Sequence, residues 1–114
     1  MKIGVFAVLY GELTLPAMLE KVKSFGLTTV EIGCGGFPGK SHCDPEVLLA
    51  YPKKLEAFKQ AFQEAGMEIS ALSVHGNALH PNPVIAKRFH EDWRNACRLA
   101  AKLGITIINT FSGC

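Results

Sequence analysis

The sequence predicts an α/β protein with the element order βαβαβαβ and a parallel sheet. Three times along the chain, a helix-like segment is followed by a glycine and then by an apolar strand-like run, at Gly26, Gly66 and Gly104. Each glycine stands where the end of a helix favours a left-handed residue. Single helices between strands are typical of parallel sheets. The pattern stops with its fourth strand-like run, which suggests half of a larger fold.

The first half of the chain gives two strands and one helix. Residues 2–10 are apolar on both faces, as in a buried parallel strand, and residues 28–33 form the second strand. Thr14 is expected to cap the helix between them, with Pro16 in its first turn. The expected apolar stripe of this helix is Leu15, Met18, Leu19, Val22 and Phe25.

The second half continues the alternation. Asp44 and Pro45 start a helical region that Pro52 divides into a short turn and a main helix, and the third strand covers residues 69–75. Asn82 starts the longest helix after a loop at residues 76–83, and the fourth strand covers residues 105–111. The main helix is expected to bury Leu55, Phe58, Phe62 and Ala65, and the longest helix Ile85, Phe89, Trp93, Ala96, Ala100 and Leu103. With no linker, residues 1–114 are expected to form one domain.

Composition limits the partners and the compartment. A formal net charge of +2 over 114 residues argues against a nucleic-acid or membrane partner. No apolar run approaches the length of a membrane span, and the opening run lacks the features of a signal peptide. The four cysteines include no CxxC pair, which favours reduced thiols in a cytoplasmic protein.

Glu31 is the first candidate site residue, because it lies inside an otherwise apolar strand. Its neighbours Val30 and Ile32 should face the helices, so alternation turns the Glu31 carboxylate toward the opposite, concave face of the sheet. A buried lone charge costs several kcal/mol unless it is paired. Glu31 is therefore either part of a structural ion pair or part of a functional site.

Further polar residues gather where the later strands end, which is where parallel α/β proteins place their working groups. His75 ends the third strand on the same face as Ser73, and the following loop adds Asn77 and His80. Asn109 interrupts the apolar fourth strand and points a polar amide toward the same interior. Backbone-bonded histidines and a satisfied buried amide are the structural alternatives.

The glycine-rich loop at residues 33–40 matches neither a dinucleotide-binding fingerprint nor a P-loop. We interpret it as a flexible active-site loop, with a phosphate-binding cradle as the second interpretation. Cys34 and Cys43 together with the histidines fit no standard zinc spacing.

The whole chain resembles the N-terminal half of a sugar-phosphate isomerase or epimerase of the xylose isomerase-like barrel superfamily. The resemblance rests on residues 1–6 (MKIGVF), 26–33 (GLTTVEIG), 73–77 (SVHGN) and the helix at 89–100 (FHEDWRNACRLA). It implies that this parallel βαβαβαβ half-barrel is the N-terminal half of a (βα)8 TIM barrel of ~250 residues or more.

The resemblance also implies a chemistry. Members of the family interconvert sugars by proton transfer next to a carbonyl, with a divalent metal (Mn, Mg, Zn or Co) that a glutamate, an aspartate, a histidine and a second glutamate hold, mainly from later strands. This chain would then not hold the metal fully, and alone it would be inactive. Its contribution would be to bind a small sugar substrate through Glu31, His75, Asn77 and His80, with Asn109 expected beside them. The catalytic residues are not assigned.

Three alternatives remain open. An endonuclease IV-like hydrolase would use a strand-three histidine as a zinc ligand, where His75 stands, but it would also need a strand-four histidine where this chain has Phe111, Ser112 and Gly113. A non-catalytic half-barrel would associate with itself or with a partner chain through the exposed edges of its sheet. A complete flavodoxin-like domain would carry helices on both faces of the sheet.

Overall fold

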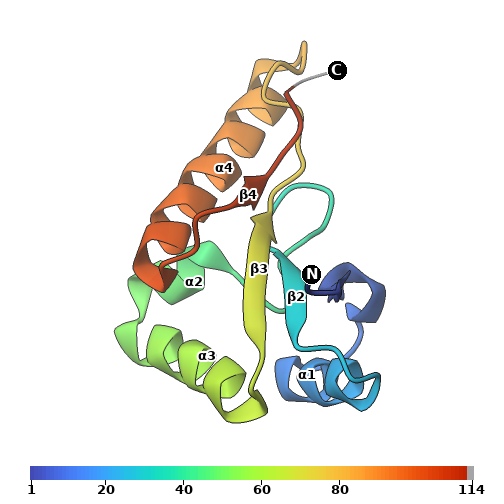
Figure 1. The fold of residues 1–114 in the computed structure, drawn as a ribbon. Helices are drawn as coiled ribbons and strands as arrows, with labels where there is room; N and C mark the ends of the chain where they lie inside the picture. Colours follow the sequence, from blue (N-terminus) through green and yellow to red (C-terminus); the bar gives the residue numbers. More distant parts are fainter. Residues whose placement is uncertain (113–114) are drawn as a thin grey trace.

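The computed structural model describes residues 1–112 and contains one four-stranded parallel sheet in the order β1-β2-β3-β4. The strands are β1 (Gly4–Phe6), β2 (Thr29–Gly33), β3 (Glu68–Ser73) and β4 (Ile108–Asn109). The predicted α/β fold class and strand order are thereby confirmed (Figure 1). Gly113 and Cys114, which the sequence assigns to the end of the fourth strand, lie outside the described residues.

The predicted first strand is too long. β1 ends at Phe6, and Ala7–Tyr10 form the 3-10 helix η1. Periodicity alone cannot distinguish a short apolar run in a strand from one in a helical turn. Here the chain leaves the ladder after Phe6, the last residue that pairs with β2, and Val8 and Leu9 become exposed.

The fourth strand is also shorter than predicted. β4 pairs only with the end of β3, through Leu72 with Ile108 and Ser73 with Asn109, and lies at the edge of the sheet. An edge strand has a ladder partner on one side only. Of the preceding residues that the sequence assigns to the strand, Ile107 still accepts the Leu72 N–H at 3.1 Å, whereas residues 105–106 lie outside the strand.

Four α-helices connect the strands: α1 (Leu15–Ser24), α2 (Pro45–Ala50), α3 (Pro52–Ala65) and α4 (Pro83–Leu103). The predicted caps are confirmed, because the side chains of Thr14, Asp44 and Asn82 each accept a backbone N–H of the first turn. The glycines after α1, α3 and α4 all adopt the expected left-handed conformation.

The helices form one layer along the sheet. Helix α1 contacts α3, α3 contacts α2, and α2 contacts α4, so the four helices follow one another on the same side (Figure 1). A doubly wound domain of the flavodoxin type would place helices on both faces. The single layer excludes that alternative for residues 1–112 and leaves the other face of the sheet open for a site.

The core lies between this layer and the sheet, and it confirms most of the predicted inward positions, including Leu55, Phe58 and Phe62. The prediction was wrong for Ile85 and Trp93 of α4 and for Phe25 at the end of α1, which are exposed. Since α4 lies beside the edge strand β4, the structure covers only one flank of this helix. The buried stripe is rotated accordingly, toward Asp92, Ala96, Leu99 and Ala100.

A β-bulge in β3 aligns the two central strands. Val30 pairs with Ile69, whereas the next residue, Glu31, pairs with Ala71, so that Ser70 is the extra residue. The Ser70 hydroxyl donates to the Val30 carbonyl at 3.1 Å. The bulge keeps Ile69 and Leu72 on the helix side while Ala71 and Ser73 share the face of Glu31.

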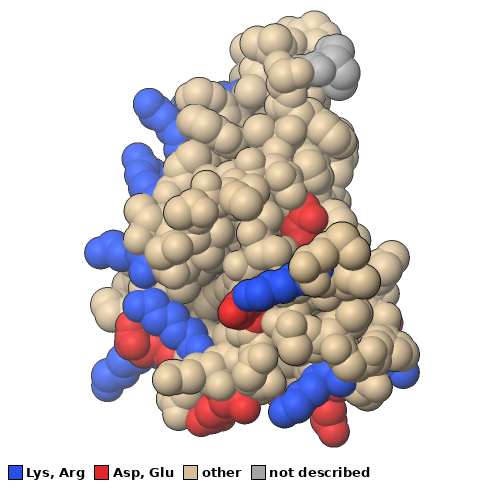
Figure 2. All heavy atoms as spheres, viewed as in Figure 1, with Lys and Arg blue, Asp and Glu red and all other residues tan. Residues whose placement is uncertain are grey.

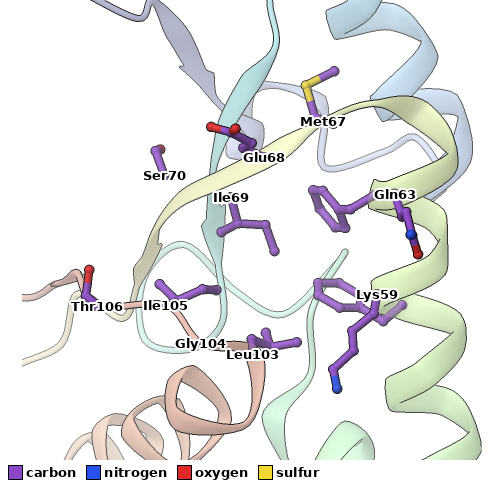
Figure 3. A pocket seen from close by; sticks show the side chains of 12 residues that line it. Lys59, Gln63, Met67, Glu68, Ile69, Ser70, Leu103, Gly104, Ile105 and Thr106 are labelled. Carbon is purple, nitrogen blue, oxygen red and sulfur yellow. The ribbon is translucent and has the colours of Figure 1, made fainter.

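An open groove of about 440 Å³ lies on the helix side of the sheet, at the amino-terminal end of β3 (Figure 3). Its walls are Phe58 and Phe62 of α3, Ile69, and the segment from Leu103 to Ile105, which links α4 to β4. The groove is remote from the strand ends that carry the predicted site residues. Among residues 1–112, no helix has the length and apolarity that a bilayer crossing requires.

Candidate functional site

The structure brings Glu31, Ser73 and Asn109 together across three adjacent strands. The Ser73 hydroxyl and the Asn109 amide both donate a hydrogen bond to Oε1 of Glu31, the latter over 2.9 Å. Parallel register explains the cluster, because Ser73 pairs with Asn109 and Glu31 lies two residues before the Ser73 partner Gly33. The carboxylate is thus held by two neutral donors, and among residues 1–112 it has no salt-bridge partner.

An open hollow of about 350 Å³ begins beside Glu31 and extends toward the amino-terminal ends of the strands. Phe6, Thr29 and Glu68 contribute to its walls. Glu31 itself is only partly buried, so a small polar molecule can approach the carboxylate from this side. A carboxylate with fixed donors behind it and open space in front is suited to bind hydroxyl groups.

His75 lies in an aromatic setting at the carboxyl end of β3. Its ring stacks on Phe111 with centroids 4.5 Å apart and meets the edge of Phe6 at 6.4 Å. Its Nδ1 is buried and has no hydrogen-bond partner within the described part of the chain. A buried polar atom without a partner is costly, and such atoms are often completed by a ligand or a bound water.

The hydrogen bonds described here for Asn77 and His80 do not involve Glu31, Ser73 or Asn109. The Asn77 side chain accepts the backbone N–H of Leu79 at 3.0 Å, and Nδ1 of His80 accepts the backbone N–H of Asn82 at 3.0 Å. Both contacts shape the turn that leads into α4. A role in binding substrate stays a prediction for these two residues.

The glycine-rich loop uses its amides within the protein. Cys34 N–H donates to Ser73, Phe37 N–H to His75 and Gly39 N–H to Gly36, at distances between 2.7 and 3.2 Å. A phosphate cradle needs such amides free to face the anion. The contacts therefore give the cradle interpretation no support and place the loop over the end of β3.

Asp92 is a residue of this region that the sequence analysis missed. It lies on α4, is buried, accepts the Gly36 N–H at 3.1 Å through Oδ2 and pairs with Nζ of Lys40 at 2.9 Å through Oδ1. Partial burial lowers the pKa of Lys40, but the hydrogen bond and charge of Asp92 outweigh it and hold this pKa above its usual range. Asp92 lies three residues after Phe89 and four before Ala96, so helical spacing also allows it on the buried face. The sequence analysis placed its apolar neighbour Trp93 there instead.

The cysteines are free thiols at Cys34, Cys43 and Cys97. Burial raises the pKa of Cys34 to about 12, aided by the nearby charge of Asp92, and burial also raises the pKa of Cys43. Both thiols therefore stay protonated and unreactive near neutral pH. Cys114 lies outside the described residues.

An apolar rim, which we define as the exposed side chains Phe37, Leu79 and Phe111, lies near the carboxyl end of β3. Figure 2 shows few charged side chains over the upper part of the molecule, where Figure 1 places the carboxyl end of β3 and the loop that follows it. Exposed aromatic rings thus lie next to His75, because Phe111 stacks on its ring and Phe37 lies beside Phe111.

Comparison with known proteins decides the family. The family described as "Xylose isomerase-like TIM barrel" matches residues 19–114. The chain belongs to this family. It is also 28% identical over 113 residues to a protein of Bacillus subtilis (strain 168) named "Uncharacterized protein YfiH". That alignment covers 99% of this chain and 36% of the relative, so the chain spans about a third of the length of that protein.

Membership of this family raises the question of a metal. Among residues 1–112, no three side chains of the histidine, cysteine, aspartate or glutamate type converge to hold an ion. Oε1 of Glu31 is already shared by two donors, and His75 is surrounded by aromatic rings. The described residues thus do not fit a metal centre by themselves, and a metal in the whole protein stays a prediction.

Proposed function

We propose that this chain is the N-terminal part of an isomerase or epimerase that interconverts a sugar or sugar phosphate by proton transfer next to a carbonyl. The Glu31 carboxylate carries the proposal, since Ser73 and Asn109 hold it on the open face of a sheet of this family. Glu31 binds a substrate hydroxyl, and the aromatic groups around His75 accept an apolar face of the sugar. The metal belongs to the proposal for the whole protein, and no residue of this chain is assigned to it.

The gene is the first test. Reading it beyond the Cys114 codon should reveal four more βα units with Glu, Asp, His and Glu at strand ends. A stop codon directly after Cys114 would contradict the isomerase proposal for this chain.

The full-length protein should then be assayed for ketose epimerisation with Mn²⁺, Mg²⁺, Zn²⁺ or Co²⁺ added. Glu31→Gln removes the charge and keeps the shape, so we expect kcat/KM to fall about 100-fold. Glu64→Gln is the matched control, because Glu64 is an exposed helix residue that accepts a hydrogen bond from its helix neighbour Gln60 at 2.7 Å. Equal activity of the two variants would contradict the role of Glu31.

Self-association is a second candidate, favoured by apolar side chains near both outer strands. Ile3 precedes β1 and Ile107 precedes β4, and both are more than half exposed. Outer strands with unpaired ladder groups and apolar neighbours favour association. Sedimentation of the chain at micromolar concentration tests this candidate, and a monomer would argue against it.

A further inference from the structure

The glycine-rich loop lies directly on the strand that ends in His75. Two of its amides donate to β3 and the residues just after it, Cys34 N–H to Ser73 and Phe37 N–H to His75. Gly36 makes the approach possible, because a Cβ atom there would lie 2.1 Å from the His75 carbonyl oxygen and its φ is +66°. The loop therefore has a defined position over the site.

Asp92 of α4 holds the same loop through two contacts. Its two carboxylate oxygens are divided between Gly36 and Lys40, which lie on either side of Phe37 in the sequence. The Asp92 side chain is 8% exposed and that of Lys40 is 28% exposed. A hydrogen bond to a buried carboxylate is among the stronger neutral-to-charged contacts in proteins, so the two ends of this short segment are fixed.

Phe37, which lies in the segment between Gly36 and Lys40 that Asp92 holds, has the most exposed ring of the apolar rim. Phe37 is 68% exposed, and its ring lies 5.3 Å from Phe89 and 6.4 Å from Phe111. Phe111 in turn stacks on His75. Since so much of the Phe37 ring faces solvent, packing alone cannot fix it, and its place in the rim depends on the backbone that Asp92 anchors.

We propose that Asp92 is a positioning residue of the carbohydrate site, which holds Phe37 in the rim as the wall against which the apolar C–H face of a sugar packs. This inference rests on the proposed function for the class of ligand. Asp92 does not touch the substrate. It acts through Gly36 and Lys40, and Phe37 makes the contact.

Hydrogen exchange in the full-length protein tests the anchoring without any ligand. In Asp92→Asn and Lys40→Met, we expect protection of the amides of Gly36, Phe37 and Gly39 to fall about tenfold while that of β2 and β3 is unchanged. Glu91→Gln is the control, because Glu91 is an exposed neighbour on α4 that pairs with the surface residue Lys87 at 3.9 Å and makes no contact with the loop that the structure records. Unchanged protection of the loop in both variants would overturn the proposal. If Asp92→Asn also loosens the sheet, the variant of the less buried partner, Lys40→Met, decides.

Binding of xylitol, a polyol without a carbonyl, tests the consequence. We expect titration calorimetry on the full-length protein to show affinity reduced about tenfold in both Phe37→Ala and Asp92→Asn, and unchanged in Glu91→Gln. Wild-type affinity in Asp92→Asn, with a loosened loop, would overturn the positioning role. Absence of xylitol binding by the wild-type protein, with the loop protected as expected, would count against the proposed function instead.

Discussion

The hydrogen bond between Ser73 and Glu31 can be tested through stability, with a second serine of the same strand as its control. Ser73 is fully buried and donates to a carboxylate, whereas Ser70 is exposed and donates to the neutral backbone carbonyl of Val30. Ser→Ala at either position removes one hydroxyl from β3. The two variants therefore differ in the acceptor that is lost and in its burial.

Hydrogen bonds to charged groups contribute about 1.5–3 kcal/mol and neutral ones about 0.5–1.5 kcal/mol. Because Glu31 is partly exposed, we take the lower half of the first range and expect Ser73→Ala to reduce the free energy of unfolding by about 2 kcal/mol. For Ser70→Ala we expect about 0.5 kcal/mol, since water can replace its partner. Urea denaturation followed by far-UV circular dichroism measures both, provided that the m-values agree.

A double-mutant cycle decides whether Glu31 is the cause. In a Glu31→Ala background, Ser73→Ala should cost less than about 0.5 kcal/mol, which leaves a coupling energy of roughly 1.5 kcal/mol. The reasoning is refuted if Ser73→Ala costs the same in both backgrounds. Such a result would mean that the Ser73 hydroxyl stabilises the fold through packing alone, and that its hydrogen bond to Glu31 contributes nothing measurable.

Three further outcomes are expected. The free energy of unfolding should fall as pH rises from 9 toward 12. The reason is that burial keeps the Cys34 and Cys43 thiols protonated in the folded state, whereas the unfolded chain releases these protons. Urea titrations at each pH should show a flatter dependence for the double variant Cys34→Ala, Cys43→Ala. Gly36→Ala should lower the free energy of unfolding by more than ~3 kcal/mol and Gly39→Ala by about 1 kcal/mol. Both glycines have positive φ, but only a Cβ atom at Gly36 would clash with the His75 backbone. Similar urea midpoints for the two variants would contradict this prediction. The purified 114-residue chain should show little or no epimerase turnover, and robust metal-dependent activity would disprove that expectation.

The positions of most secondary-structure elements followed from local sequence signals. Thr14, Asp44 and Asn82 can satisfy unpaired N–H groups wherever a helix starts, and the glycines after the helices adopt a conformation that other residues avoid. Alternation around Glu31 placed its carboxylate opposite to Val30 and Ile32, which are both buried on the helix side. These signals are local, so the sequence by itself determined the βα order and the polar face.

Only the tertiary structure decided which polar groups meet. The contact of Glu31 with Asn109 joins residues 78 positions apart, and it depends on strand register and on the bulge at Ser70, neither of which leaves a local signal. The inward position of Asp92 depends on the rotation of α4 beside an edge strand, and hydrophobicity instead favoured its neighbour Trp93. A charge is accepted inside because a specific amide and a specific ammonium surround it, and such partners exist only once the chain has folded.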